Sequence, residues 1–136
     1  MRPDSGPVTP PVGVLVVDAH QAFRRAAREV IEAALPEFVL VGEATSGEHA
    51  LAAMDDLDPD LVLIDVRMAG MDGIETCRRV RAAHPDAVVV LVSTDDLLNL
   101  PAEVGFCGAA DLVSKQDMKP ALLRRLWHLH GAAPRA

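Results

Sequence analysis

Aromatic side chains are scarce in this sequence of 136 residues, which contains three Phe, one Trp and no Tyr. Half of the residues (50%) are nevertheless hydrophobic. That is enough apolar surface to offset the chain entropy of one compact domain. The core must therefore be aliphatic, with Val-rich strands covered by Ala- and Leu-rich helices.

Positive charge is also in deficit, because 13 Lys and Arg stand against 20 Asp and Glu, for a net charge of −7. A nucleic-acid surface needs clustered Lys and Arg, so direct binding of DNA or RNA is not expected. An acidic balance suits a domain that gathers carboxylates around a cation or meets a basic partner.

Paired cysteines, long apolar runs and a leader are lacking as well. Cys77 and Cys107 form no CxxC pair and are expected to be buried thiols in a reducing compartment. No apolar run reaches the roughly 18 residues that a membrane span requires. The Pro-rich start has neither the basic nor the apolar region of a signal peptide. We therefore expect a cytoplasmic protein that makes no membrane contact.

Five apolar, β-branched runs alternate with segments of helical spacing. The runs are Val12–Val17, Phe38–Ala44, Leu61–Val66, Ala87–Val92 and Asp111–Ser114. The first, third and fourth are almost continuously hydrophobic, which is typical of strands buried on both faces of a parallel sheet. One domain is expected over residues 12–130, between disordered tails at 1–11 and 131–136.

Helices are expected between these runs. The expected helices are Gln21–Leu35, Gly47–Met54 after the N-cap Ser46, Gly73–Ala83 after the N-cap Asp72, a short one at Pro101–Val104 that follows an irregular stretch at Asp96–Leu100, and a last helix from Pro120 to about His130. Repeated strand–helix alternation predicts a doubly wound α/β fold, with a five-stranded parallel sheet and helices on both faces.

Polar residues stand where four of the strands end. Asp18 follows the first strand, Asp65 the third, Ser93 the fourth and Lys115 the fifth. Ligands of doubly wound sheets bind beyond the carboxyl ends of the strands, so these side chains are expected at one edge. An aspartate can accept a phosphoryl group, and a hard cation such as Mg²⁺ can offset its charge. Taken singly, each residue has an ordinary alternative as a turn, cap or surface residue.

These segments resemble the receiver domain of bacterial response regulators over about Val12 to His130. The motifs that support the resemblance are VLVVDAH, LVLIDVRMAGMDG, VLVST and LVSK, of which the second is the most specific. The resemblance implies a flavodoxin-like sheet in the order 2-1-3-4-5 and a role in two-component signal transduction. His20 and the lack of Pro after Lys115 are similar to receivers of LuxR-type regulators.

The resemblance also implies roles for the residues at this edge. Asp65 would accept a phosphoryl group from a sensor histidine kinase or a phosphotransfer protein, and Ser93 and Lys115 would contact that group. Mg²⁺ would be held by Asp18, Asp65 and the backbone carbonyl of Arg67. The face built from the fourth helix, fifth strand and fifth helix would bind an output partner or a second copy. No enzymatic activity is expected beyond self-catalysed phosphorylation and dephosphorylation.

Four positions depart from the family pattern. Ala19 replaces a second acid that is normally a direct metal ligand, so Mg²⁺ binding should be weakened. Leu112 replaces the aromatic that reports the switch, so an aromatic rotamer switch is not available. Ala69 and Gln116 stand in place of prolines, and the first of these changes should cost only local rigidity.

Two other groups of residues lie near the expected site. Arg67 and Asp95 fit a surface ion pair; the sharper hypothesis is that Arg67 supplies positive charge where Ala19 has weakened metal binding. The five histidines show no ligand spacing around a shared metal. They are expected at the surface or in loops, with His20 alone near the site.

Two alternatives to a phosphorylated receiver stay open. A degenerate receiver, acting as a phosphorylation-independent interaction module, is favoured by Ala19 and Leu112. An enzyme is disfavoured: Arg67 stands where hydrolases of the haloacid dehalogenase kind have a second Asp, and no GxGxxG or P-loop follows Val17. A stand-alone receiver and a fragment of a longer regulator both fit the sequence.

Overall fold

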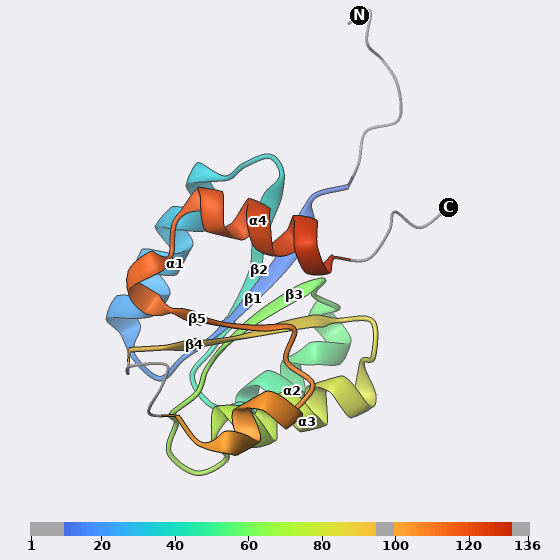
Figure 1. Ribbon diagram of the computed structural model, residues 1–136. Coiled ribbons are helices and arrows are strands. Elements are labelled where there is room, and N and C mark those ends of the chain that lie inside the picture. The colour runs from blue at the N-terminus through green and yellow to red at the C-terminus, as the bar shows by residue number, and fades with distance from the viewer. Residues whose placement is uncertain (1–9, 95–99, 132–136) are drawn as a thin grey trace, which may run out of the picture.

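A five-stranded parallel sheet forms the centre of the computed structural model, which describes residues 10–94 and 100–131. The strand order is β2-β1-β3-β4-β5 (Figure 1). The strands are β1 (Val12–Val17), β2 (Phe38–Ala44), β3 (Leu61–Asp65), β4 (Val88–Ser93) and β5 (Asp111–Ser114). This arrangement confirms the predicted doubly wound α/β fold and the predicted strand order.

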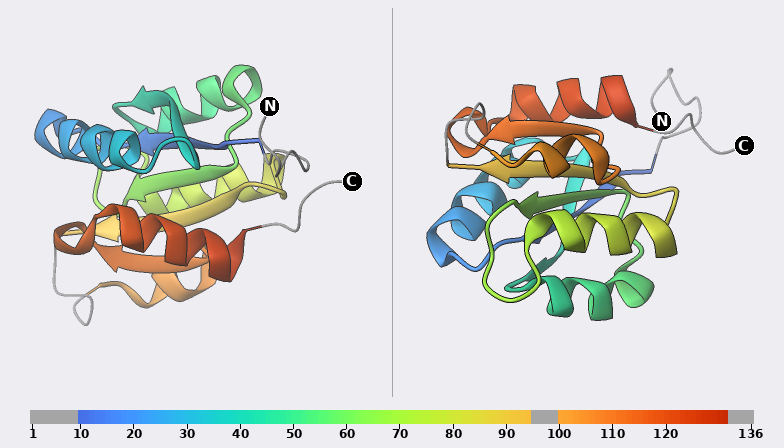
Figure 2. Two further views of the ribbon diagram at one scale, coloured as in Figure 1. Left: turned by 90° about the horizontal axis from the view of Figure 1, so that it is seen from above. Right: turned by 60° about the horizontal axis from the view of Figure 1, so that its bottom comes forward.

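Helices cover both faces of the sheet, as Figures 1 and 2 show. The first and last, α1 (Gln21–Ala33) and α4 (Pro120–His130), pack on one face, and α2 (Gly47–Leu57) and α3 (Gly73–Ala83) pack on the other. Two 3₁₀ turns, η2 (Ala102–Phe106) and η3 (Lys115–Asp117), flank β5. Each face of the sheet therefore has its own hydrophobic core.

The predicted caps and most predicted boundaries are confirmed. Ser46 Oγ accepts a hydrogen bond from the backbone N–H of His49 at 3.0 Å, and Asp72 Oδ1 accepts one from Glu75 at 2.9 Å. Three predicted helices differ: α1 ends at Ala33 instead of Leu35, α2 continues to Leu57 instead of ending at Met54, and the short helix after Pro101 is a 3₁₀ turn. Of the predicted irregular stretch 96–100 only residue 100 lies inside the described residues. The tails predicted at 1–11 and 131–136 lie outside them apart from residues 10, 11 and 131.

The core is aliphatic, as the scarcity of aromatics predicts. The side chains of β1, β3 and β4 are buried along their whole length, and Phe38 is the largest fully buried side chain among the described residues. Cys77 and Cys107 are buried free thiols. Burial, together with the neighbouring Cys107, raises the pKa of the Cys77 thiol to about 12. Cys77 is therefore a packing residue with little thiolate character.

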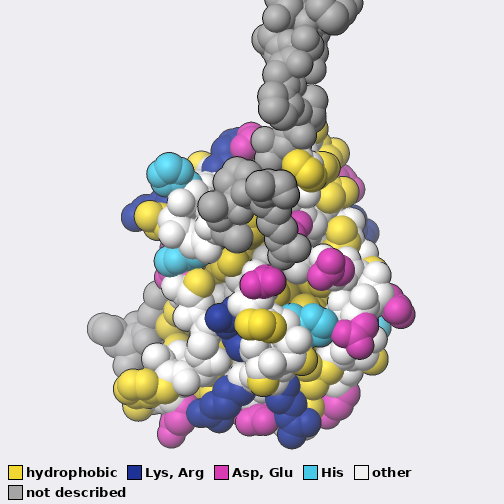
Figure 3. All heavy atoms as spheres, turned by 90° about the vertical axis from the view of Figure 1, so that its right-hand side faces the viewer, with side chains coloured by type: hydrophobic (Ala, Val, Ile, Leu, Met, Phe, Trp, Pro, Cys, Tyr) yellow, Lys and Arg dark blue, Asp and Glu magenta, His cyan; other side chains and the backbone are white. Residues whose placement is uncertain are grey.

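Two edges of the sheet differ in character. The edge at which the strands begin faces the viewer in Figure 3, where acidic, basic and hydrophobic side chains are interspersed. At the opposite edge, where the strands end, Asp18 and Asp65 are buried. A buried carboxylate is costly unless it is paired, so this second edge is where a site is expected. None of the helices in the described part of the chain could cross a bilayer.

The chain makes a close turn directly behind Asp65, at Gly73. Its backbone N–H donates to the carbonyl of Val66 at 2.9 Å. A Cβ added at Gly73 would overlap the carbonyl oxygen of Asp65 and lie 2.7 Å from the Cα of Val66. Only glycine leaves room for this approach, which fixes the loop between β3 and α3 against the strand end.

We predict that Gly73→Ala lowers the free energy of unfolding by about 1–3 kcal/mol, because backbone atoms must move to admit the methyl group. Gly105→Ala is the matched control, since a Cβ there meets nothing within 4 Å. Its effect should stay within about 0.5 kcal/mol. Urea denaturation measures both, and equal stabilities of the two variants would contradict the prediction.

Candidate functional site

The register of the sheet places the two predicted acids side by side. Val17 pairs with Ile64 between β1 and β3, and Asp18 and Asp65 are the next residues along each strand. Asp18 is fully buried, and only 5% of the surface of Asp65 is exposed. Two carboxylates held together away from water need a compensating cation.

The other two predicted residues arrive from the neighbouring strands. Ser93 is buried at the end of β4 and pairs in register with Ser114 at the end of β5. Lys115 follows β5 directly and begins η3. The expectation that all four side chains share one edge of the sheet is therefore confirmed for their positions in the fold.

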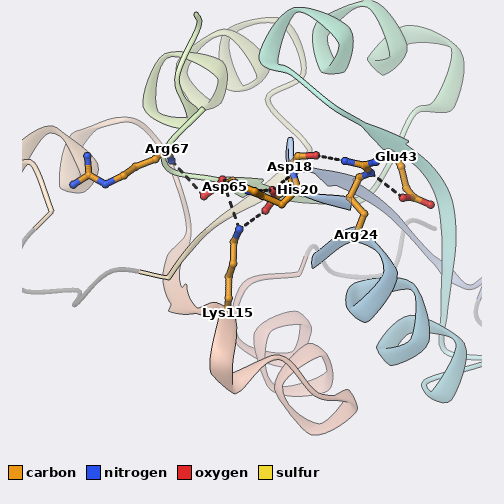
Figure 4. Close-up of polar contacts among 7 residues, drawn as sticks. All are labelled: Asp18, His20, Arg24, Glu43, Asp65, Arg67 and Lys115. Atoms are coloured by element: carbon orange, nitrogen blue, oxygen red, sulfur yellow. Dashed lines mark hydrogen bonds and ion pairs between the residues drawn. The ribbon is translucent and has the colours of Figure 1, made fainter. Parts of the chain in front are cut away.

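The ammonium group of Lys115 lies between the two acids (Figure 4). Its Nζ is 2.5 Å from Asp18 Oδ2 and 3.6 Å from Asp65 Oδ2. Nζ also lies 4.6 Å from the centroid of the Phe23 ring, within the range of a cation–π interaction. Because the Lys115 side chain is only 8% exposed, this contact is screened far less than a surface ion pair.

His20 approaches the same carboxylates from the start of α1. Its Nδ1 is 3.1 Å from Asp18 Oδ1 and 4.0 Å from Asp65 Oδ2, and its backbone N–H donates to Asp18 Oδ1 at 2.8 Å. Among the described residues, Asp18, His20 and Asp65 are the group whose ligand atoms could hold a metal ion, all within 4.8 Å of one another. His20 is the histidine that the sequence analysis expected near the site, and the structure places it there.

Arg24, in the first turn of α1, contacts both the end of β1 and the neighbouring strand β2. Its Nη1 donates to the backbone carbonyl of Asp18 at 2.7 Å, and its Nε lies 3.2 Å from Glu43 Oε1 on β2. The sequence alone assigned no role at the site to Arg24. The available signal was position, since α1 starts only four residues after the end of β1 and so keeps its first turn near that strand end.

Asp65 titrates above its ordinary range. Burial is the largest cause, and the charge of Asp18 adds to it, so the pKa of Asp65 is raised from 3.8. Lys115, the backbone N–H of Arg67 and His20 oppose this shift without cancelling it. The raised pKa means that the carboxylate of Asp65 is destabilised relative to its protonated form.

Arg67 contacts Asp65 through its backbone, whose N–H donates to Asp65 Oδ1 at 3.3 Å. Figure 4 shows the Arg67 side chain directed away from the carboxylates, and the residue is exposed. Asp95, its predicted ion-pair partner, lies outside the described residues. The modulating role of the Arg67–Asp95 pair and the ligand role of the Arg67 carbonyl therefore stay predictions.

Comparison with known proteins agrees with this geometry. Residues 14–126 match the family model of the response regulator receiver domain. The response regulator GacA of Pseudomonas viridiflava is 36% identical over 104 residues, which cover 76% of this chain and 48% of GacA. The nitrate/nitrite response regulator NarL of Escherichia coli K12 is 35% identical over 86 residues, or 63% of this chain and 39% of NarL.

A solved structure extends the agreement to the fold. The signal receiver domain of the response regulator NarL from Mycobacterium tuberculosis has a TM-score of 0.75 and 30% identity, covering 86% of this chain and 97% of that one. The sheet order and the acid–lysine pocket define a CheY-like α/β domain. The chain belongs to the family of response regulator receiver domains of two-component systems. It spans about half the length, or less, of the curated relatives cited above.

Removal of the buried ammonium should be costly. We predict that Lys115→Met lowers the free energy of unfolding at neutral pH by about 3 kcal/mol, because Asp18 and Asp65 lose their shared cation. Arg124→Met is the control: Arg124 pairs with Glu37 at 2.9 Å at the surface and should change stability by about 0–1 kcal/mol. Similar losses in the two variants, measured by chemical denaturation, would rule out a stabilising role for the pocket contact.

The raised pKa of Asp65 leads to a prediction about how the free energy of unfolding depends on pH. A carboxyl group whose pKa is raised on folding stabilises the fold below pH 3.8, and this contribution is lost as pH rises through the raised pKa. Asp65→Asn removes the charge, so the variant should be more stable than the parent at neutral pH.

That advantage of Asp65→Asn should shrink as the pH falls to 3.8 and below, because both proteins then have an uncharged side chain at position 65. Denaturation across this pH range measures the gap. Asp56→Asn, at an exposed site on α2, is the control and should stay within about 0.5 kcal/mol throughout. A gap that stays constant with pH, or that grows toward low pH, would contradict the prediction.

Proposed function

We propose that this chain is a working receiver, in which Asp65 accepts a phosphoryl group from the phosphohistidine of a sensor kinase or a phosphotransfer protein. The observation that supports this proposal is the position of Lys115, whose ammonium lies between the buried carboxylates Asp18 and Asp65. A carboxylate oxygen of Asp65 attacks phosphorus, the P–N bond to the imidazole breaks, and the departing nitrogen keeps the electron pair. The chain is thus a phosphoryl acceptor and turns over no separate substrate.

The neighbours of Asp65 have distinct tasks in this reaction. The backbone N–H of Arg67 holds Oδ1 and so orients the carboxylate. Lys115 lies 3.6 Å from Oδ2 and supplies positive charge for the phosphoryl oxygens that arrive there. In our proposal the buried hydroxyl of Ser93, at the neighbouring strand end, donates a hydrogen bond to the same group.

The side chains of this pocket are of the type that binds a divalent cation, because Asp18 and Asp65 offer the carboxylate oxygens that hard cations prefer. The proposed ligands of Mg²⁺ are these two side chains and the backbone carbonyl of Arg67. When bound, the ion would offset the negative charge that develops during transfer. Affinity should be low, because Ala19 contributes no carboxylate and Lys115 already contacts Asp18.

The readout of phosphorylation belongs, in this proposal, to the face built from η2, β5 and α4, which corresponds to the predicted fourth helix–fifth strand–fifth helix face. Lys115 connects the pocket to this face because it directly follows β5. Phe106 on η2 is 84% exposed and offers an apolar contact for an output partner or a second copy. Phosphorylation would shift the population of this face between two states.

One observation favours a second candidate, the degenerate receiver. The 2.5 Å contact between Lys115 and Asp18 gives the buried acid a compensating charge without a bound cation or a phosphoryl group. A phosphorylation-independent interaction module would need nothing more. The two candidates differ in a single measurable property, which is the reactivity of Asp65.

Intact-mass spectrometry after incubation with acetyl phosphate, with and without Mg²⁺, tests the proposal. We expect a gain of one phosphoryl group that depends on Mg²⁺, is absent in Asp65→Asn and persists in the control Asp56→Asn. Ala19→Asp should raise the extent of labelling at low Mg²⁺, because it returns a carboxylate to the pocket. The absence of labelling in the parent and in Ala19→Asp, at any Mg²⁺ concentration, would favour the degenerate module.

A further inference from the structure

Arg24 contacts the backbone of the acidic pocket. Its Nη1 donates to the backbone carbonyl of Asp18 at 2.7 Å, and its Nε lies 3.2 Å from Glu43 Oε1 (Figure 4). Only 15% of the Arg24 side chain is exposed. Its ion pair among the described residues is therefore with an acid on β2, while the contact with Asp18 is made to a backbone atom. A guanidinium in this place acts on the position of Asp18.

Three hydrogen bonds together define the position of Asp18. Its N–H donates to the carbonyl of Ala44 at 3.0 Å, its Oδ1 accepts from the N–H of His20 at 2.8 Å, and its carbonyl accepts from Arg24. Because β1 ends at Val17, the carbonyl of Asp18 lies beyond the strand, and a buried carbonyl needs a donor. Arg24 supplies that donor and so fixes the peptide bond that follows Asp18.

Arginine suits this position because its guanidinium donates in two directions at once. One nitrogen serves the carbonyl and another serves Glu43, and both contacts are charge-assisted. Glu43 is itself held by Arg28, whose Nη2 lies 2.6 Å from Glu43 Oε2. A lysine has the same charge but a single ammonium in place of the fork. Lysine at this position would therefore hold the carbonyl less firmly.

The side chain of Asp18 leaves the strand from the backbone that Arg24 holds. Its Oδ2 lies 2.5 Å from Lys115 Nζ, which in turn is 3.6 Å from Asp65 Oδ2. A displacement of Asp18 thus changes the charge arrangement around Asp65. Displacements of about 1 Å from remote substitutions can slow a reaction by up to about a hundredfold.

We propose that Arg24 is a positioning residue for phosphoryl transfer to Asp65, which acts through the backbone carbonyl of Asp18 and is itself held in place by Glu43. Arg24 exchanges no proton and forms no bond in the reaction. The inference rests on the proposed function for its chemical consequence, and on the contacts described above for the positioning itself.

The rate of labelling by acetyl phosphate at saturating Mg²⁺, followed by intact-mass spectrometry of the full chain, tests the chemical consequence. Arg24→Ala should be slower than the parent by about tenfold or more. Arg24→Lys, which keeps the charge without the fork, should stay at least about threefold below the parent. Arg25→Ala is the matched control, since Arg25 is the next residue and is exposed; its rate should lie within about twofold of the parent.

Amide hydrogen exchange, measured by NMR without any phosphoryl donor, tests the positioning directly. Arg24→Ala should speed exchange of the His20 N–H, which donates to Asp18 Oδ1, by about tenfold or more. The N–H of Val62, in the buried strand β3, reports on unfolding of the whole domain. Its exchange should change much less than that of His20, because a purely structural role would accelerate both amides together.

Glu43→Gln tests whether Glu43 acts through Arg24. The substitution keeps an oxygen acceptor but removes the charge, so labelling should slow by less than in Arg24→Ala. Residues that act through one contact are not additive. The double variant Arg24→Ala with Glu43→Gln should therefore be labelled within about twofold of the rate of Arg24→Ala alone.

A parental labelling rate in folded Arg24→Ala would overturn the inference, and so would full recovery by Arg24→Lys, which would assign the effect to charge. Equal acceleration of His20 and Val62 exchange would reduce Arg24 to a stabilising residue. Additive losses in the double variant would remove Glu43 from the proposal. A parent that takes no phosphoryl group would contradict the proposed function instead, and His20 exchange would still decide whether Arg24 positions the end of β1.

Discussion

The contact of Lys115 with Asp18 and Asp65 is the interaction on which the rest of the site depends. Two like charges cannot both stay ionised away from water unless a cation compensates them, and the ammonium at 2.5 Å and 3.6 Å does this. Its own position is set by β5, which ends one residue earlier, and by the ring of Phe23 at 4.6 Å. The ammonium of Lys115, held at the end of the last strand, thus contacts residues of the central strands and of the first turn of α1.

The fold could be predicted because its strands are buried on both faces and therefore appear as uninterrupted aliphatic runs. Boundaries were harder to predict where apolar identity and backbone preference disagree. Leu35 is apolar and extended the predicted first helix, but it is 54% exposed and precedes Pro36, which disfavours helical backbone in the residue before it. Likewise the segment after Pro101 forms a 3₁₀ turn instead of a regular helix. Gly105 within the turn and Gly108 after it, with a φ of 91°, both disfavour a helix there.

The site could be predicted only as far as strand ends define it. Asp18, Asp65, Ser93 and Lys115 were accessible because residues that follow parallel strands meet at one edge. The side-chain directions were not accessible, since they depend on how α1 sits over that edge. For this reason the sequence did not indicate that Lys115 lies nearer to Asp18 than to Asp65, or that the His20 ring approaches both carboxylates.

The components of the pocket come from opposite ends of the domain in sequence, the acids from the first and third strands and the ammonium from behind the fifth. A chain emerging from the ribosome presents both aspartates long before Lys115. Until then, docking β1 beside β3 brings two uncompensated charges together, which opposes closure of that edge. We therefore expect this edge of the sheet to close only after β5 has been synthesised, because β5 positions the compensating charge of Lys115.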